Sequence, residues 1–162
     1  MLNIVLFQPE IPQNTGNIAR TCAVLGARLH LIRPFGFRLT DPGFKRSVMD
    51  YLTGVEILDH AAWGAFIEGV PDVSRVFLTS GLGGTAYTSA AFQRGDYLVF
   101  GPESDGLPPA LLELHGALTI PMPGIGRGLN VAVSVGIVAF EAARQITKGW
   151  SVVTPDSSAR GS

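Results

Sequence analysis

Short apolar runs alternate with segments of helical spacing along most of this chain, and turn-forming residues follow the runs. The apolar run 3–7 precedes Pro9 and Pro12, a helical segment comes next, and the alternating run 28–33 then meets Pro34. A strand, a helix and a strand within about thirty residues form one βαβ unit, which implies a parallel sheet. We therefore predict an α/β fold in which helices flank a parallel sheet.

The same pattern continues to the end of the chain. Expected strands span 3–7, 28–33, 75–79, 97–100 and 117–120. Asn14 or Thr15 is expected to cap a first helix that ends at Gly26, and further helices are expected over 42–52, 61–67, 108–114 and 131–145. Such alternation is typical of doubly wound α/β domains. We expect one domain over residues 1–150 and a disordered, Ser-containing tail over 151–162.

Composition excludes several classes of protein. Cys22 is the only cysteine and the three histidines lack zinc-like spacing, so we expect neither an internal disulfide nor a metal site. No apolar run reaches the length of a membrane span, and the first residues lack a basic signal-peptide region. We therefore expect a cytoplasmic protein with no membrane partner.

Charge is unevenly distributed along the chain. Residues 1–50 contain six Lys and Arg against three acidic residues, a local charge of +3, whereas the remaining residues sum to −4. Such a cluster could dock a phosphate backbone or be ordinary solvated surface. Both interpretations stay open at this point.

Two apolar runs lead into loops rich in Gly and Pro, at 101–108 and 121–130. Gly lacks the Cβ that would hold a ligand away from the backbone, and Pro keeps its neighbours extended. These loops predict a main-chain pocket for a polar, nucleoside-sized ligand at the carboxyl ends of two neighbouring strands. The chain has no GxGxxG, P-loop or GxSxG motif, which argues against a dinucleotide, a nucleotide triphosphate or a serine-hydrolase site.

Together with the segment Asn-Thr-Gly-Asn-Ile-Ala-Arg at 14–20, these two loops resemble the three motifs of the SpoU-TrmD (SPOUT) RNA methyltransferases. Within that superfamily, residues 3–17 are similar to the opening of the small tRNA wobble-nucleotide 2'-O-methyltransferases of the TrmL type. The likeness extends over roughly residues 1–148. It implies a deep C-terminal trefoil knot, S-adenosylmethionine as the methyl donor, and a homodimer with each active site near the interface.

The resemblance also implies roles for individual residues. Arg20 would contact the ribose hydroxyl and help to deprotonate it; because arginine stays protonated, we expect it to stabilise the developing negative charge. Apart from the resemblance, Glu103 could orient Arg20, accept from the substrate or be an ordinary solvated side chain. Asn130 would fix the third-motif loop or touch the cofactor, besides capping the final helix.

The cofactor would contact Leu78, Thr79, Gly101, Ile120, Met122, Gly128 and Leu129. RNA phosphates would meet Arg20, Lys45, Arg46 and Arg127, and Phe35, Phe37 and Tyr51 are either base-stacking or core aromatics.

The expected activity is S-adenosylmethionine-dependent 2'-O-methylation of tRNA at the wobble nucleotide, position 34, a cytidine or a modified uridine. The third motif, Leu-Asn-Val-Ala-Val at 129–133, is closer to the broader SpoU pattern than to the wobble-enzyme pattern. Two alternatives therefore stay open. One is a 2'-O-methyltransferase for ribosomal RNA or another tRNA position, and the other is a non-catalytic RNA-binding module of the same fold.

The segment 131–145 predicts a helix that is apolar on nearly all sides. Ala132, Gly136, Ala139 and Ala143 recur three or four residues apart, which would let another backbone approach closely. The pattern favours a dimer interface over a helix buried within one subunit.

Overall fold

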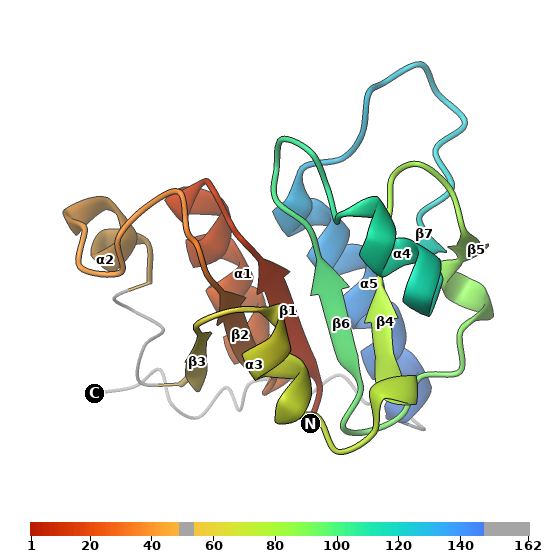
Figure 1. Cartoon of the computed structure of the whole chain (residues 1–162), viewed down its shortest axis with the longest axis horizontal. Coiled ribbons are helices and arrows are strands. Elements are labelled where there is room, and N and C mark those ends of the chain that lie inside the picture. Colours follow the sequence, from red (N-terminus) through yellow and green to blue (C-terminus); the bar gives the residue numbers. More distant parts are fainter. Residues whose placement is uncertain (49–53, 148–162) are drawn as a thin grey trace, which may run out of the picture.

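The computed structural model describes residues 1–48 and 54–147, so the predicted tail at 151–162 lies outside the described residues. The main sheet has five parallel strands in the order β3-β2-β1-β6-β4 (Figure 1). The strands are β1 (Asn3–Phe7), β2 (Arg28–Ile32), β3 (Ile57–His60), β4 (Val76–Leu78) and β6 (Tyr97–Phe100). This arrangement confirms the predicted parallel α/β sheet.

Helices cover both faces of this sheet (Figure 1). The helices are α1 (Pro12–Leu25), α2 (Pro42–Val48), α3 (Trp63–Glu68), α4 (Pro109–His115) and α5 (Val131–Ile146), with short 3-10 turns at Val73–Arg75 and Tyr87–Ser89. Side chains alternate along each strand, so Ile4 and Leu6 pack with α1, α2 and α5, whereas Val5 and Phe7 pack on the α3 and α4 side. The result is a three-layer domain with two apolar cores.

The first helix begins earlier than predicted. Pro12 occupies its first turn, where a missing N–H costs nothing, and Ile11 is the N-cap residue. Asn14 and Thr15 are buried inside the helix, so the prediction that one of them caps it is wrong. Gly26 ends the helix in the left-handed conformation, as predicted.

The strand predicted at 117–120 does not join the main sheet. Its ordered part is β7 (Leu118–Thr119), which pairs with β5 (Thr85–Ala86) in a separate two-stranded sheet. A single bridge between Thr79 and Leu118 connects β7 to the end of β4. Strand β6 lies between β1 and β4, and the two Gly/Pro-rich loops do not follow neighbouring strands of one sheet as we had expected.

Strand β3 was not predicted at all. It is an edge strand with half-buried side chains, and its sequence Ile-Leu-Asp-His does not alternate cleanly. The predicted helix at 42–52 is observed as α2, and its expected end falls on residues outside the described ones. Within residues 1–48 and 54–147, no helix is both long and apolar enough to cross a bilayer.

Candidate functional site

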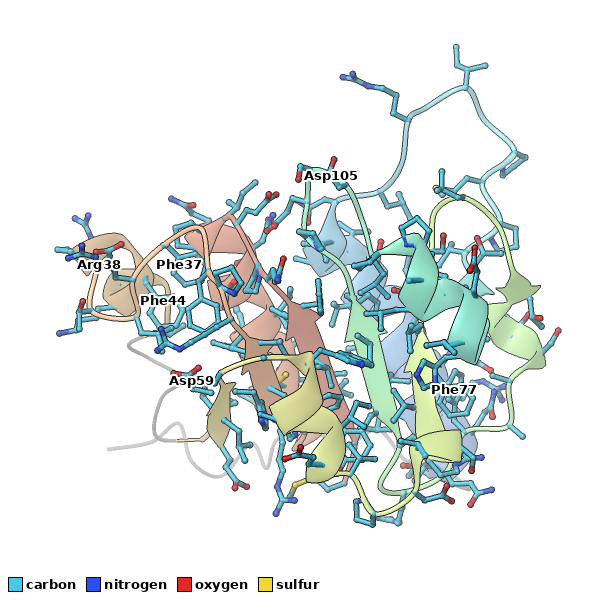
Figure 2. The ribbon with its side chains drawn as sticks, viewed as in Figure 1. Phe37, Arg38, Phe44, Asp59, Phe77 and Asp105 are labelled. Carbon is cyan, nitrogen blue, oxygen red and sulfur yellow. The ribbon has the colours of Figure 1, made fainter. Side chains whose placement is uncertain are left out.

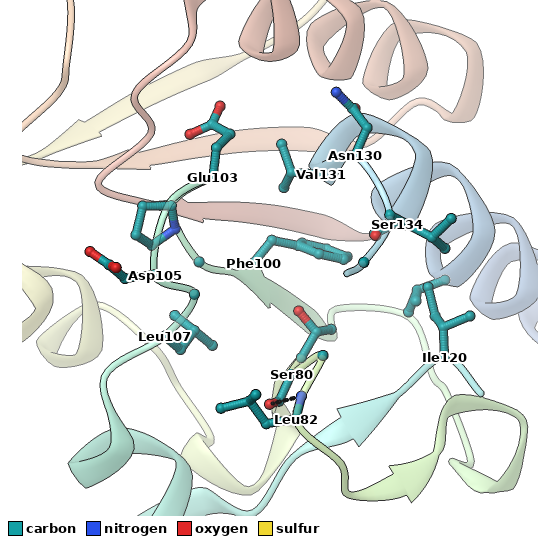
Figure 3. Close-up of a pocket in the computed structure, with 18 of the residues that line it drawn as sticks. Ser80, Leu82, Phe100, Glu103, Asp105, Leu107, Ile120, Asn130, Val131 and Ser134 are labelled. Atoms are coloured by element: carbon teal, nitrogen blue, oxygen red, sulfur yellow. Dashed lines mark hydrogen bonds between the residues drawn. The ribbon is translucent and has the colours of Figure 1, made fainter. Parts of the chain in front are cut away.

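A cavity of about 390 Å³ opens at the carboxyl ends of β4 and β6. This volume falls within the range of small-molecule sites. Three loops surround the cavity, namely 79–82 after β4, 100–107 after β6 and 118–131 before α5, and the start of α1 closes it (Figure 3). Most of the predicted cofactor residues lie on its wall: Thr79, Gly101, Ile120, Met122, Gly128 and Leu129.

The wall combines apolar side chains with main chain. Leu82, Ile120 and Met122 supply apolar surface, and Figure 3 shows Leu82 beside Ser80, whose hydroxyl accepts a hydrogen bond from the Leu82 N–H at 3.0 Å. The Thr79 hydroxyl donates to the Val99 carbonyl at 2.9 Å. The Thr79 backbone N–H donates to the same carbonyl at 3.0 Å, so the two hydrogen bonds fix Thr79 against β6.

Leu78 is the exception among the predicted cofactor residues. Its side chain is 1% exposed and packs in the core under α3 and α4. Strand alternation turns Leu78 into that core, and the next residue, Thr79, reaches the cavity.

The second loop closes tightly on itself at Gly101. A Cβ on Gly101 would lie 2.4 Å from the Gly106 carbonyl carbon and 2.4 Å from the Leu107 nitrogen. No side chain fits in that space. Gly106 adopts a left-handed conformation and its N–H donates to the Pro102 carbonyl at 3.1 Å, while Leu107 is buried and anchors the far end of the loop.

Glu103 connects this loop to the start of α1. Its carboxylate accepts hydrogen bonds from the N–H groups of Glu10 at 2.8 Å and Ile11 at 3.2 Å, and from the Asn14 side chain at 3.1 Å. A carboxylate at a helix N-terminus satisfies free N–H groups and opposes the positive end of the helix dipole. Glu103 is therefore a positioning residue in this structure.

Glu10 forms a second contact between the same two loops. Its carboxylate accepts hydrogen bonds from the Ser104 N–H at 2.9 Å and the Ser104 hydroxyl at 2.8 Å. The loops after β1 and β6 are thus joined by two carboxylates in opposite directions. These contacts hold the first and second motifs in a fixed relation at the mouth of the cavity.

Asn130 extends this network to the third loop. Its side-chain oxygen accepts from the Ala132 N–H at 2.8 Å, which confirms Asn130 as the cap of α5. Its amide group donates to the Asn14 oxygen at 2.9 Å. Asn14 thus bridges Glu103 and Asn130, and the chain of three side chains joins all three predicted motifs.

The predicted RNA-binding residues do not form one cluster. Arg127 lines the cavity. Arg20 lies in the second half of α1 with an exposed side chain, and Lys45 and Arg46 are exposed on α2, which packs against α1. None of these three is part of the cavity wall.

Sequence reasoning missed several residues on the cavity wall. They are Ile11, Asn14, Ser80, Leu82, Asp105, Phe100 and Ser134. Asn14 and Ser80 adjoin segments that we had singled out, so a signal was present. Ser134 lies on the first turn of α5, where only the fold shows that it turns toward the cavity (Figure 3).

Cys22 takes no part in this site. It is fully buried in α1, and burial raises the pKa of its thiol to about 12. A thiol with such a pKa stays protonated at neutral pH and is a poor nucleophile.

Comparison with known proteins gives consistent matches. The sequence model of the SpoU rRNA methylase family matches residues 1–140. A tRNA (cytidine(34)-2'-O)-methyltransferase from Saccharophagus degradans is 44% identical over 150 residues, covering 90% of this chain and 96% of the relative. The protein of the same name from Escherichia coli K12 is 42% identical over 149 residues, covering 90% and 94%.

Solved structures agree with these relatives. One, described as giving structural insights into the 2-OH methylation of C/U34 on tRNA, has a TM-score of 0.87 and 53% identity, covering 90% of this chain and 95% of the other. The SpoU methyltransferase AviRb from Streptomyces viridochromogenes, in complex with AdoMet, has a TM-score of 0.76 and 26% identity, covering 90% and 60%.

Proposed function

This chain belongs to the SpoU rRNA methylase family, and from that premise we infer that it is a tRNA 2'-O-methyltransferase acting on the wobble nucleotide. It transfers a methyl group from S-adenosylmethionine to the ribose 2'-hydroxyl of nucleotide 34 in the anticodon loop, a cytidine or a modified uridine. The observation that carries this conclusion is the near full-length similarity, at 44% identity, to a tRNA (cytidine(34)-2'-O)-methyltransferase.

The cavity suits the donor S-adenosylmethionine. Apolar side chains offer a surface for a purine, the main chain around Gly101 offers hydrogen-bonding groups, and the carboxylate of Asp105 at the rim favours a positively charged sulfonium. When bound, the donor supplies an electrophilic methyl group. We propose that Thr79, Gly101, Ile120, Met122, Gly128 and Leu129 contact it, and that the buried Leu78 supports the wall from behind.

We propose that the protein accelerates the reaction mainly by positioning and electrostatics. A ribose hydroxyl must align with the methyl group; as the O–CH3 bond forms, the S–CH3 bond breaks, S-adenosylhomocysteine leaves and the hydroxyl proton passes to water. Arginine stays protonated, so Arg20 is assigned to stabilise the developing negative charge on the hydroxyl oxygen rather than to act as a general base. Glu103 and Asn130 act indirectly, because their hydrogen bonds hold the three loops together.

Arg20 lies outside the cavity wall of the single chain. We propose that the enzyme is a homodimer in which α5 contributes to the interface and the catalytic Arg20 works beside it. Support comes from exposed apolar residues on one face of α5, where Val133 is 49% and Phe140 39% exposed. The buried residues Val135, Val138, Ala139 and Ala142 cover only the opposite face, so α5 is not enclosed within one subunit.

We also propose a deep trefoil knot within a single SPOUT domain over residues 1–150. Support comes from the path of the chain, because α4 packs on one face of the sheet and α5 on the other. The segment between them therefore crosses the carboxyl edge, where the cavity lies. We place the enzyme in the cytoplasm, where its tRNA substrate is found.

Lys45, Arg46 and Arg127 are proposed to bind phosphates of the tRNA, with Arg20 at the reacting nucleotide. Such contacts orient RNA without reading its sequence. Their separation over α2 and the cavity rim suits an extended substrate rather than a free nucleotide.

The proposal is tested by incubating the protein with labelled S-adenosylmethionine and either total tRNA or ribosomal RNA, followed by nucleoside mass spectrometry. We expect 2'-O-methylcytidine, or the 2'-O-methylated form of a modified uridine, from tRNA only. A methylated product from ribosomal RNA alone would support the alternative substrate, and cofactor binding without any product would support a non-catalytic module.

A further inference from the structure

The loop after β2 contains a stack of planar side chains that ends in an exposed guanidinium. Phe44 is 5% exposed in the core, its ring stacks on Phe37 at 5.3 Å, and Phe37 stacks on Phe35 at 5.8 Å. The guanidinium carbon of Arg33 lies 4.9 Å from the centre of the Phe35 ring. Figure 2 shows Phe37 and Phe44 beside each other at α2.

Arg33 is fixed in this position from two further directions. Its guanidinium donates to the Asp59 carboxylate with Nε at 2.9 and 3.2 Å and a terminal nitrogen at 2.6 Å. Its backbone N–H donates to the His60 carbonyl at 2.9 Å. The side chain nevertheless remains 52% exposed. A planar group is thus held rigidly while much of its surface stays in contact with solvent.

The stack formed by Arg33 and the three phenylalanine rings is connected to the mouth of the cavity. Arg33 directly follows β2 at the same carboxyl edge of the sheet. The Gly36 N–H donates to the Pro9 carbonyl at 2.9 Å, and a Cβ on Gly36 would lie 2.7 Å from Glu10 backbone atoms. Glu10 in turn binds Ser104 of the second loop. These contacts therefore hold the stack and the cavity in fixed positions relative to each other.

The surface around this stack carries several basic residues. Arg38, Lys45 and Arg46 are exposed on the loop and on α2, and Figure 2 shows Arg38 at the outer end of this region. Asp41 and Asp59 lie among these residues. Asp59 is paired with Arg33, and Asp41 accepts a hydrogen bond from the Arg38 N–H at 2.8 Å. This charge favours a polyanion that carries exposed planar groups.

On these grounds we propose that Arg33 is a stacking platform for an unpaired base of the tRNA anticodon loop. Unpaired bases are recognised by stacking on aromatic rings or on guanidinium planes. The Phe35 and Phe37 rings are partly buried against the core, so their role is to support the guanidinium. Tyr51, the third aromatic named from the sequence, lies outside the described residues. The inference rests on the proposed function, because it takes tRNA as the substrate.

The test compares Arg33→Ala and Arg33→Lys with the wild-type enzyme. Stacking on one base typically changes affinity by about tenfold. We expect the KM for tRNA to rise about tenfold in both variants, with kcat and the Kd of S-adenosylmethionine unchanged. Lysine keeps the positive charge but has no planar group on which a base could stack. A wild-type KM for tRNA in Arg33→Lys would therefore show that Arg33 acts only through its charge, and would overturn the proposal.

Arg28→Ala is the matched control. Arg28 lies on the same strand and forms a similar exposed pair with Glu56 at 2.6 Å, but at the amino end of the strand. We expect no change in its KM for tRNA. Thermal unfolding of each variant identifies any loss of folding, and Phe35→Leu, which removes the ring behind the guanidinium, should weaken tRNA binding in the same direction as Arg33→Ala.

A binding measurement separates this inference from the proposed function. Anticodon stem-loop RNAs carry the fluorescent base 2-aminopurine at single loop positions, and stacking quenches the emission. We expect quenching at one position with wild-type protein and its loss with Arg33→Ala. Equal quenching by both proteins would overturn the platform even if methylation occurs, and quenching that needs Arg33 would sustain it even if methylation fails.

Discussion

Gly101 shows how a single residue determines the shape of the cavity. The backbone of Gly106 and Leu107 passes so close to it that a methyl group would overlap both. We predict that Gly101→Ala destabilises the protein by about 1–3 kcal/mol, as overpacking does, and weakens S-adenosylmethionine binding at least about tenfold. Urea unfolding and isothermal titration calorimetry measure the two effects.

Gly64→Ala is the control for that substitution. A Cβ on Gly64 meets nothing within 4 Å, and the residue lies within α3, where alanine is the better helix former. We expect unchanged cofactor affinity and equal or higher stability. Normal cofactor binding by Gly101→Ala would show that the second loop does not shape the cofactor site.

Arg20 is predicted to affect chemistry and not cofactor binding. We expect Arg20→Ala to keep its affinity for S-adenosylmethionine within a few-fold, because Arg20 does not line the cavity. Single-turnover methylation should slow by at least about a hundredfold, the cost of losing one donor to a developing oxyanion. Arg94→Ala, which removes an exposed arginine before β6, serves as the control. Parallel loss of binding and turnover in Arg20→Ala would make Arg20 a structural residue.

At the residue scale, composition predicted the site better than local capping rules did. Glycine and proline content identified the loops, and Gly101 and Gly128 line the cavity as expected. Asn14 fits a local capping pattern, yet its partner is Glu103, 89 positions away in the sequence. Local rules cannot anticipate such a contact, because only the folded sheet brings the two loops together.

At the scale of elements, strands β2 and β3 are joined by a histidine pair. His30 Nδ1 lies 2.9 Å from His60 Nε2, and His30 Nε2 lies 3.2 Å from the Asn3 side-chain oxygen. The Asn3 amide group donates to the Gly95 carbonyl, so its oxygen must accept. His30 therefore donates from Nε2. The lowered pKa of His30 favours its neutral form, in which Nδ1 accepts a hydrogen bond from His60 Nε2.

This pair predicts a loss of stability at acidic pH. Burial, and then the neighbouring His60 and Arg28, lower the pKa of His30 from 6.5 to about 4, and burial also lowers the pKa of His60. Between these pH values the unfolded chain binds a proton that the native protein does not. The stability contributed is complete above pH 6.5 and decreases toward pH 4, by about 3 kcal/mol for His30.

Urea unfolding across this pH range tests the prediction. We expect His30→Gln to flatten the slope of unfolding free energy against pH, although the variant is less stable overall. His115→Gln, at an exposed position at the end of α4, should keep the wild-type slope. If the slope of unfolding free energy against pH were unchanged in His30→Gln, the pH dependence could not be assigned to His30.

The elements were predicted well where their patterns were clear. The helix α5 and the strands β1 and β6 were located from continuous apolar patterns, and β2 was located from its alternation and the proline that follows it. The strand β3 was missed and β7 was assigned to the wrong neighbours. Strand β3 is as long as β6 but does not alternate cleanly, and β7 has only two residues, so its pairing depends on the segment that lies beside it.

At the scale of the whole molecule, the exposed face of α5 predicts a dimer. Val133, Ile137 and Phe140 recur at helical spacing on this face. We expect the wild-type protein to sediment as a dimer and Val133→Glu to sediment as a monomer, because a charge would be buried in the interface. Leu114→Glu is the control, since Leu114 is 78% exposed on α4, away from α5. A monomeric wild-type protein would contradict the dimer.

The 2'-oxygen of nucleotide 34 is the proposed acceptor of the methyl group. The most direct measurement uses two synthetic tRNAs that differ only in a ribose or a 2'-deoxyribose at that position, with labelled S-adenosylmethionine as the donor. We expect methylation of the first tRNA and none of the second, although both bind the enzyme. Equal incorporation of label into both tRNAs would show that the methyl group goes elsewhere.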